Sequence, residues 1–360
     1  MSEFQIQKKH LAKARIIDTS LPTANEGEIV LKVDKFAFTA NNLTYGVMGE
    51  QIGYWQFFPP QDNASGEWGI IPVWGFADVI ESKAEGIPVG ERLYGYFSPA
   101  AYVTMLPVGI SSKRFIDGSE HRSALPAGYN MYRRVKAEPG YNPELDNERM
   151  LLFPLYLTSF CLWDYLQDRN WYGAKQCIII SASSKTSIGL AYALHADESA
   201  PPIIGLTSQR NLALVNKLGI YDSGLLYEYI SRIDASIPSV IVDMSGNAPL
   251  LGALHKHLAE NMRHCINVGL THWEESHSDE AVNSQRSEFF FAPSHIQKRL
   301  QDWGPKVFEQ KTTEFMFATT LKCRAWLKLT KLEGLKGLSE VYQDVCDGKI
   351  APDEGLIIEL

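Results

Sequence analysis

Hydrophobic and polar positions follow two different patterns along the chain, and the change lies near residue 150. Before it, short runs of alternating residues are broken by Gly, Pro and Asn, as in EIVLKVDKFAF at 28–38 and IPVWGFADVIES at 71–82. This alternation predicts short antiparallel strands in a barrel or sandwich. Residues 108–148 show little periodicity. We expect a long irregular connection there, and such connections often carry function.

After residue 150, short apolar runs alternate with amphipathic segments. Strands alternating with helices of this length predict parallel β-α-β units, and so a doubly wound α/β domain. A further amphipathic helix is expected at 334–350 and a strand at 354–360. The other expected strands are CIIIS at 177–181, PPIIGLT at 201–207, SVIVDMSG at 239–246 and HCINVGL at 264–270, and the other expected helices lie at 153–170, 188–197, 211–219 and 248–262.

Composition narrows the class of protein. A length of 360 residues suffices for two domains, and 45% hydrophobic with 21% charged residues is ordinary for a globular protein. The net charge of −8 argues against a general nucleic-acid binder. The longest apolar runs fall well short of the ~20 residues that cross a bilayer. The opening MSEFQIQKKH has no apolar signal core. We therefore expect a soluble, cytoplasmic protein with no nucleic-acid or membrane partner.

Cysteine and histidine spacing gives no sign of a metal site. The five cysteines are widely separated and never form C-x-x-C, and the nine histidines show no H-E-x-x-H or similar spacing. We expect neither a disulfide framework nor bound zinc.

The polar turn after the strand near 177–180 raises the main functional question. It reads SASSKTS at 181–187, and a helix follows. Strand, polar turn and helix is the layout of two phosphate-binding loops. Lys185-Thr186 imitates the triphosphate loop G-x-x-x-x-G-K-S/T, with Asp243 as an acid at a later strand end. Serines, however, replace the glycines that such a loop needs to wrap a phosphate.

A dinucleotide turn fits the neighbouring elements better. Pyrophosphate is held at a helix N-terminus, where free N–H groups and the helix dipole favour negative charge. Small hydroxyl residues can approach it, and Gly189 would let the helix pack against the strand. Because the turn lacks glycine, we do not expect positive φ angles in it. The expected cofactor contacts are Ser183, Ser184, Lys185, Thr186, Ser187 and Gly189, with Asp243 and Gly269 near the ends of later strands.

The end of the next strand indicates which dinucleotide is bound. It reads GLTSQR at 205–210 and contains no acidic residue. Asp or Glu at this place holds the ribose hydroxyls of NAD, whereas Arg with hydroxyl partners suits a 2′-phosphate. Ser208 and Arg210 therefore predict NADP(H). The alternative interpretation is a helix cap followed by a surface arginine.

These features together resemble the medium-chain dehydrogenase/reductase superfamily, especially its zinc-free quinone oxidoreductase-like branch. GEIVLKVDKFAFTANNLTYGVMG at 27–49 is similar to its opening strand and Asn-containing substrate loop, and Gly90-Glu91-Arg92 to its G-D-R. SASSKTSIGLAYAL at 181–194 is similar to its A-x-G-G-V-G turn. More narrowly, TANNLTY, YWQFFPP, PVWGFADV, FPLYLTSF and ASSKTSIGLA resemble a subfamily known only as a conserved domain of unknown function.

The resemblance implies the architecture. It implies a GroES-like β-barrel domain for substrate and catalysis at 1–148 and 313–360, a Rossmann dinucleotide-binding domain at 149–312, and a homodimer. The G-H-E motif and the four-cysteine lobe of the zinc enzymes are absent from the sequence.

The resemblance also implies catalytic residues. The amides of Asn41 and Asn42 would hold a substrate carbonyl, and Tyr45 would donate a proton. Thr158 and Ser159 would lie near the nicotinamide. The alternative is an Asn-Asn turn with a packed tyrosine, and hydroxyl side chains that bond back to their own helix. The aromatic group at 54–58 either walls a substrate pocket or fills the barrel core.

The leading hypothesis is a zinc-independent, NADP(H)-dependent oxidoreductase that reduces a carbonyl or an activated double bond of a small, apolar molecule. Two alternatives stay open. One is a dehydrogenase-like scaffold without catalysis that serves as a binding or assembly protein, favoured by the lost turn glycines. The other is a triphosphate-binding enzyme that uses Lys185-Thr186.

Overall fold

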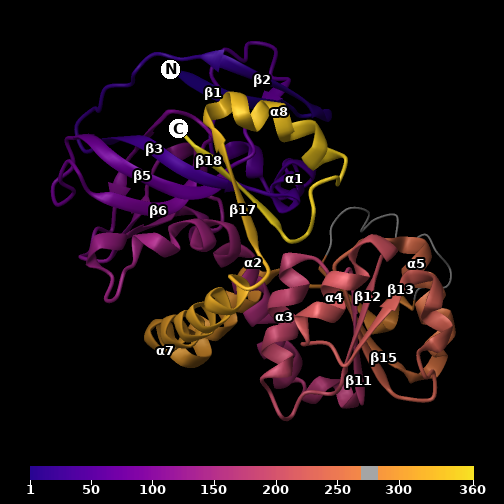
Figure 1. Ribbon diagram of the computed structural model, residues 1–360. Helices are drawn as coiled ribbons and strands as arrows, with labels where there is room; N and C mark the ends of the chain where they lie inside the picture. The colour runs from indigo at the N-terminus through magenta and orange to yellow at the C-terminus, as the bar shows by residue number, and fades with distance from the viewer. Residues whose placement is uncertain (269–282) are drawn as a thin grey trace. The chain divides into compact units, whose positions relative to one another are not determined.

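The computed structural model of the protein describes residues 1–268 and 283–360, and the chain forms two compact units in it. The first unit comprises Met1–Leu151 and Lys328–Leu360, and the second comprises Leu152–Leu327 (Figure 1). The expected domain boundary after residue 312 falls inside a helix of the second unit that ends at Cys323. The assignment of the units to substrate and dinucleotide stays a prediction.

The first unit is built on two sheets whose strands pair antiparallel, except for the parallel pair of β17 and β18. Its larger sheet has the order β17-β18-β3-β5-β6-β10-β9-β8, with β7 paired to β3, and its smaller sheet has the order β2-β1-β4. The helices of this unit are α1 (Ala40–Val47) and α8 (Gly334–Cys346). The strands are β1 (Ser2–Gln7), β2 (His10–Asp18), β3 (Ile29–Phe38), β4 (Trp68–Gly69), β5 (Val73–Ser82), β6 (Arg92–Phe97), β7 (Tyr102–Met105), β8 (Pro107–Val108), β9 (Arg114–Asp117), β10 (Met131–Arg134), β17 (Lys328–Glu333) and β18 (Glu354–Glu359).

Alternating side chains of these strands and a dense aromatic group form the core of the first unit. The aromatic group at 54–58 lies in this core, because Tyr54, Trp55, Phe57 and Phe58 are all buried. The ring of Phe57 lies 5.3 Å from that of Tyr96 at an interplanar angle of 88°, an edge-to-face contact that adds to the gain from burial. This group therefore fills the barrel core.

Residues 108–148 are more regular than their sequence pattern predicts. They contribute β9 and β10, which pair with each other and continue the large sheet. Arg122 of this segment is fully buried, and its guanidinium bonds to Asp117 at 3.0 Å, to the Asn130 side chain at 2.6 Å and to the Tyr129 carbonyl at 3.1 Å. A buried charge needs such partners. Arg122 thus fastens the segment to the core.

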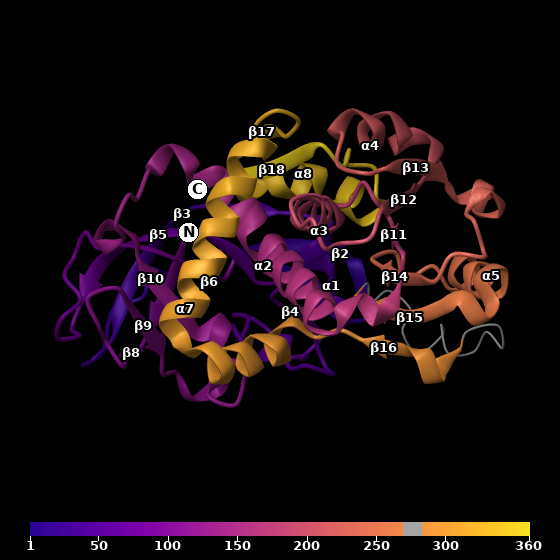
Figure 2. The ribbon, with the colours of Figure 1, turned by 90° about the horizontal axis from the view of Figure 1, so that it is seen from below.

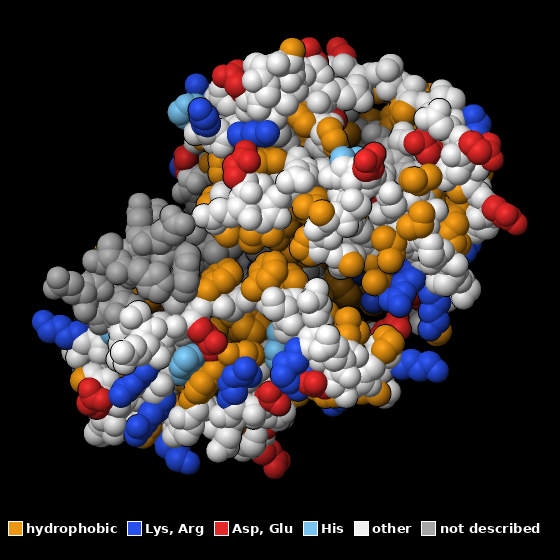
Figure 3. All heavy atoms as spheres, turned by 180° about the vertical axis from the view of Figure 1, so that it is seen from behind, with side chains coloured by type: hydrophobic (Ala, Val, Ile, Leu, Met, Phe, Trp, Pro, Cys, Tyr) orange, Lys and Arg blue, Asp and Glu red, His pale blue; other side chains and the backbone are white. Residues whose placement is uncertain are grey.

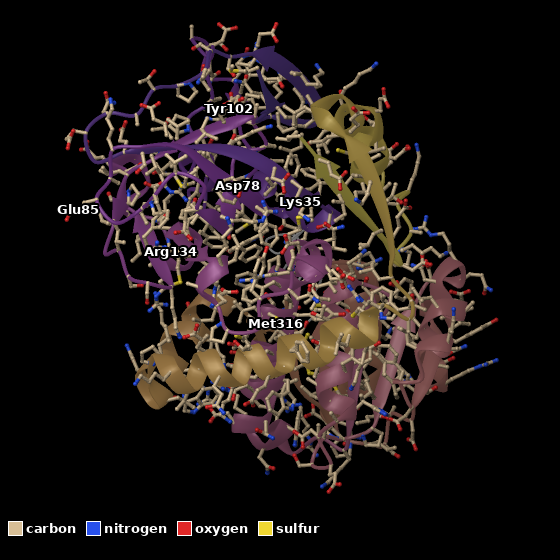
Figure 4. All side chains as sticks on the ribbon, turned by 60° about the vertical axis from the view of Figure 1, so that its left-hand side comes forward. Lys35, Asp78, Glu85, Tyr102, Arg134 and Met316 are labelled. Atoms are coloured by element: carbon tan, nitrogen blue, oxygen red, sulfur yellow. The ribbon has the colours of Figure 1, made fainter. Side chains whose placement is uncertain are left out.

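A second group of charges fixes the start of helix α2 (Asp146–Asp168) within the first unit. Arg92 bonds to Asp34 and Asp78 at 2.7 Å each, and to the buried Asp146 at 3.2 Å. Lys35 lies 3.6 Å from Asp146. Figure 4 labels Lys35 on β3 and Asp78 on β5, so neighbouring strands supply these partners. On the face shown in Figure 3, cationic and anionic side chains are interspersed.

The second unit has one parallel sheet. Its order is β13-β12-β11-β14-β15-β16, so the strand order reverses between β11 and β14, as in a dinucleotide-binding fold (Figure 2). The pattern did not predict β13 and β16, which have only four and three residues. In the described part of this unit the strands are β11 (Gln176–Ile180), β12 (Ile203–Thr207), β13 (Ser223–Leu226), β14 (Ser239–Asp243), β15 (Met262–Asn267) and β16 (Ser287–Phe289). Besides α2 from Leu152 on, its helices are α3 (Lys185–His195), α4 (Leu212–Leu218), α5 (Ala248–Leu258) and α7 (Ala292–Cys323).

Gly189 allows helices α2 and α3 to come into close contact. A Cβ atom on Gly189 would lie 2.6 Å from Ser159 Oγ and 2.6 Å from Tyr156 Cδ1. The expectation that Gly189 packs on a strand is therefore wrong, because its neighbour is helix α2. The contact lets the Ser159 hydroxyl donate to the Thr186 carbonyl at 2.7 Å.

A cluster around Glu288 ties the edge strand β16 to the rest of the second unit. Its Oε1 atom accepts hydrogen bonds from His264 at 2.7 Å, from Tyr172 at 2.8 Å and from Tyr165. Tyr172 also stacks on His264 at 4.1 Å. Burial alone would raise the pKa of Glu288, but these hydrogen bonds outweigh it and lower the pKa to about 2.

Among the described residues, no helix has both the length and the apolar composition that a membrane span requires.

We predict that Gly189→Ala destabilises the protein by about 2 kcal/mol, because the new methyl group overpacks the contact between α2 and α3. Urea unfolding measured by tryptophan fluorescence tests this. Gly128→Ala is the control, since no atom beyond its neighbours along the chain lies within 4 Å of its added Cβ. Equal stability of the two variants would contradict the packing role of Gly189.

We predict that Glu288→Gln removes a pH-dependent part of the stability. A carboxylate whose pKa falls from 4.5 to about 2 on folding stabilises the native state above pH 4.5, and this contribution is lost as the pH falls toward 2. Because Glu288 is partly exposed, we expect the free energy of unfolding of Glu288→Gln to be lower than that of the wild-type protein by about 1 kcal/mol at pH 6. This difference should shrink as the pH falls below 4.5. Urea unfolding at several pH values measures it. The exposed Glu228→Gln is the control, and parallel pH profiles for Glu288→Gln and the wild-type protein would refute the prediction.

Candidate functional site

The turn between β11 and α3 has only four residues, Ser181 to Ser184. Ser181 has φ = +64°, so the expectation that this turn avoids positive φ angles is wrong. The Ser184 N–H donates to the Ser181 carbonyl at 2.9 Å, and the Ala182 N–H donates to Leu206 of β12 at 2.9 Å. These bonds offset the cost of ~1–2 kcal/mol for a left-handed residue with a side chain. Serine therefore adopts the geometry that a glycine usually supplies.

The same turn is too short to be a triphosphate loop. In that loop a run of six residues precedes the lysine and wraps the phosphate. Here Lys185 is already the first residue of α3, and the preceding turn is closed by its own hydrogen bonds. The geometry therefore does not favour the triphosphate hypothesis.

Helix α3 starts with hydroxyl side chains at its N-terminus. Ser184 is the N-cap, and its Oγ accepts from the Ser187 N–H at 3.2 Å and donates to Ser187 Oγ at 2.8 Å. Lys185 and Thr186 follow in the first turn and are partly exposed. Among the described residues, none accepts a hydrogen bond from the Thr186 N–H. The first turn thus presents a donor, a cation and the positive end of the helix dipole.

The end of β12 lies against this turn. Arg210 lies in the short 3-10 helix Gln209–Asn211 that follows β12. Ser208 is the N-cap residue of that helix, but its side chain makes no capping hydrogen bond. Arg210 is exposed. No acidic residue occurs between Thr207 and Asn211. Asn211 donates to the Ser183 hydroxyl at 2.9 Å and so connects the two segments directly.

The remaining predicted cofactor residues lie at the ends of β14 and β15. Asp243 is buried, and its Oδ1 accepts from Ser245 N–H at 2.8 Å and from Ser245 Oγ at 2.7 Å. Burial raises the pKa of Asp243, and the bonds from Ser245 partly offset this. Gly269 lies outside the described residues.

In the first unit, the two predicted asparagines have different environments. Asn42 is buried, its Oδ1 accepts from the Thr39 N–H at 2.8 Å, and its Nδ2 donates to the Pro72 carbonyl at 3.0 Å. The Asn42 amide therefore holds the start of α1 in place. Asn41 is partly exposed and donates to Tyr45 Oη at 3.3 Å.

Tyr45 lies in an aromatic cluster and is only 7% exposed. Its Oη accepts from Asn41 and, at 3.4 Å, from the Trp74 indole N–H. Burial, and then the neighbouring Tyr129, raises the pKa of Tyr45 well above its ordinary value. The phenol therefore keeps its proton at physiological pH, and the two donors to its oxygen leave that proton for another acceptor.

Thr158 lies in α2, in the second unit. Its hydroxyl donates to the Pro154 carbonyl at 3.3 Å, one turn earlier in the helix, as the alternative interpretation predicted. The Ser159 hydroxyl likewise bonds back, to the Leu155 carbonyl at 3.1 Å, and it also contacts the Thr186 carbonyl in the first turn of α3. The sequence singled out Ser159 only as a residue near the nicotinamide, and it did not single out Asn211, because the contact of Asn211 with Ser183 is long-range. Among the described residues, no group of three or more His, Cys, Asp and Glu side chains could hold a metal ion.

Several solved structures have a similar fold over nearly the whole chain. The structure of CurA in complex with NADPH from Vibrio vulnificus has a TM-score of 0.66 at 10% identity and covers 100% of this chain and 99% of that chain. Mycobacterial Rv1454c complexed with NADPH has a TM-score of 0.60 at 13% identity and covers 100% of both chains. The quinone oxidoreductase from Coxiella burnetii has a TM-score of 0.54 at 14% identity and covers 100% of this chain and 99% of that chain.

These likenesses confirm the predicted fold, an α/β chain with a Rossmann-type parallel sheet and a GroES-like β-rich unit. No curated protein sequence matches the chain. The model of the family described as "Protein of unknown function (DUF2855)" matches residues 36–351, most of the chain, and the protein therefore belongs to this family.

Proposed function

We propose that the protein is an NADP(H)-dependent oxidoreductase that reduces a carbonyl or an activated double bond of a small, apolar molecule without zinc. The observation that carries the proposal is the edge of the parallel sheet where β11 and β12 end. A hydroxyl-lined helix N-terminus, a cation and an end of β12 without acidic residues come together there. NADPH occupies this fold in CurA and in mycobacterial Rv1454c.

The residues present suit each part of such a cofactor. The first turn of α3 provides donors and a dipole for the pyrophosphate, with Ser184, Lys185, Thr186 and Ser187 around it. Ser208 and Arg210 offer a hydroxyl and a guanidinium to a 2′-phosphate. When bound, the nicotinamide would supply the hydride.

In the first unit, Tyr45 and Asn41 are the residues we assign to the substrate. Asn41 and Trp74 both donate to Tyr45 Oη, so its own proton points to an acceptor outside this group. A substrate carbonyl oxygen is such an acceptor, and a neutral phenol stabilises the negative charge that develops on it. Because its pKa is raised, Tyr45 acts as a hydrogen-bond donor more readily than as a full acid. We leave Asn42 out of the catalytic set because its amide is used in capping α1.

We expect the wild-type protein to bind NADPH and Arg210→Ala to bind it about tenfold or more weakly, since a charge-assisted contact is worth ~1.5–3 kcal/mol. Titration followed by nicotinamide fluorescence measures both. The exposed Arg232→Ala in the same unit is the control. Folded wild-type protein that fails to bind NADPH at millimolar concentration would refute the proposal and favour the non-catalytic scaffold.

Lys185→Ala separates the dinucleotide from the triphosphate hypothesis. Under our proposal the variant binds NADPH more weakly by about 2 kcal/mol, which lies within the range for one charge-assisted contact. A triphosphate enzyme would instead lose magnesium-dependent ATP binding altogether. Calorimetric titration of wild-type and variant protein with NADPH and with ATP and magnesium distinguishes the two.

We expect Tyr45→Phe to lower kcat for reduction of enones or aldehydes by about 100-fold, because the donor to the developing oxyanion is lost. NADPH binding should not change. NADPH absorbance across a panel of small apolar carbonyl compounds measures the rate, and cofactor fluorescence measures binding. A variant with unchanged kcat on the substrate that the wild-type protein reduces fastest would remove Tyr45 from the mechanism.

A further inference from the structure

Asn211 occupies a helix N-cap position but does not cap its helix. It precedes α4, where an asparagine side chain usually accepts a hydrogen bond from an N–H of the first turn. The Asn211 side chain makes no such bond. It reaches across to the turn after β11 instead, where its Nδ2 donates to Ser183 Oγ at 2.9 Å. A cap that is given up costs about 1 kcal/mol, so the bond to Ser183 has to offset that loss.

The Ser183 hydroxyl is buried and receives two hydrogen bonds. The residue is 4% exposed. Besides the bond from Asn211, Thr207 Oγ1 donates to Ser183 Oγ at 3.4 Å. A hydroxyl has two acceptor sites and one donor proton. With both acceptor sites filled, the Ser183 proton is directed away from Asn211 and Thr207, and no described residue accepts it.

The position of Ser183 indicates which ligand atom accepts this proton. Its two donors come from the end of β12 and from the residue just before α4. The first turn of α3 is capped by a different residue, Ser184. The end of β12 is the place where this fold holds the ribose next to the adenine. The Ser208 side chain is also free of a capping bond there, and Arg210 supplies positive charge.

We propose that Ser183 donates its hydroxyl proton to the 2′-phosphate of the cofactor and that Asn211 is the positioning residue that holds Ser183 in this orientation. The pair makes selectivity for a 2′-phosphorylated dinucleotide depend on a hydrogen-bond chain from Asn211 to Ser183 to phosphate. The inference rests on the proposed function, because it requires that a dinucleotide binds at this edge. It adds a specificity-determining pair to Ser208 and Arg210.

Three variants test the chain. Ser183→Ala and Asn211→Ala should each weaken NADPH binding by about tenfold, the typical effect of a hydrogen bond to a charged group, and leave NADH binding within about twofold of the wild-type value. Asn211→Asp should weaken NADPH by about 100-fold, because a carboxylate accepts the Ser183 proton and also repels the phosphate. NADH should still bind to Asn211→Asp.

The double variant Ser183→Ala/Asn211→Ala distinguishes positioning from an independent contact. If Asn211 acts through Ser183, the double variant loses no more NADPH affinity than Ser183→Ala alone. Two ligands without nicotinamide provide a second comparison. The variants should lose affinity for adenosine 2′,5′-bisphosphate as they do for NADPH, and should keep their affinity for adenosine 5′-phosphate as they do for NADH. Ser231→Ala and Asn216→Ala, both exposed in the same unit, are the matched controls.

The outcomes are separable. Wild-type protein that binds no NADPH overturns the proposed function and this inference with it. NADPH binding with equal losses for NADPH and NADH, or with no loss, overturns the inference alone. Thermal midpoints identify a variant that does not fold. If Ser183→Ala fails in this way, the partly exposed Asn211 variants still decide the question through their NADPH-to-NADH ratio.

Discussion

The candidate site depends on the hydrogen bond from the Ser159 hydroxyl to the Thr186 carbonyl, which crosses the contact between α2 and α3. This bond requires that the two helices approach within a distance that only glycine at position 189 allows. Because the bond is made in the first turn of α3, it fixes where the N-terminus of that helix lies. The donors of that N-terminus and the hydroxyls of the turn are then held in one orientation toward the end of β12. Any anion bound there meets a preorganised set of groups.

Serine in place of glycine changes the chemistry of this turn more than its shape. Ser181 adopts a left-handed backbone, and hydrogen bonds from Ala182 and Ser184 hold the turn closed. A glycine turn offers only backbone N–H donors, whereas this turn also offers hydroxyl protons. Ser183 and Ser184 divide these donors between the ribose side and the helix side of the turn. A turn without glycine is therefore compatible with a dinucleotide site that binds its ligand through hydroxyl groups as well as backbone N–H groups.

The first unit is held by charges that are removed from water and paired over long stretches of sequence. Arg122 joins the segment around residue 120 to the core, and Arg92 joins three carboxylates from β3, β5 and the start of α2. Removing such charges from water costs free energy that offsets most of their mutual attraction. Their main effect is therefore to fix the positions of the segments that they join. They fix the irregular segments around the aromatic cluster in which Tyr45 lies. The environment of Tyr45, with two donors on its oxygen, follows from that placement.

Much of the fold could be read from local patterns, since strand and helix periodicity are local properties of the chain. The four longest strands of the parallel sheet and the helices between them were predicted in this way, and so was a polar turn after β11, although α3 begins at Lys185 and not at residue 188 as predicted. The short strands β9, β10, β13 and β16 were not predicted, because each has at most four residues and shows no clear periodicity. These segments are extended because they pair with neighbouring strands. Helix α7 was missed because Gly304 and Pro305 interrupt it and its polar and apolar residues do not segregate clearly.

The sequence by itself determined the fold class and the residues at the turn and at the end of β12, because a strand, its following turn and its helix are contiguous. It could not show that Asn42 is used in a cap, that Gly189 faces α2, or that Asn211 reaches Ser183 across 28 residues. Those facts depend on which segments the tertiary structure brings together, and a hydrogen bond between distant residues leaves no local pattern. The tertiary structure therefore decided which of the candidate side chains remain available to a ligand and which are already used by the protein.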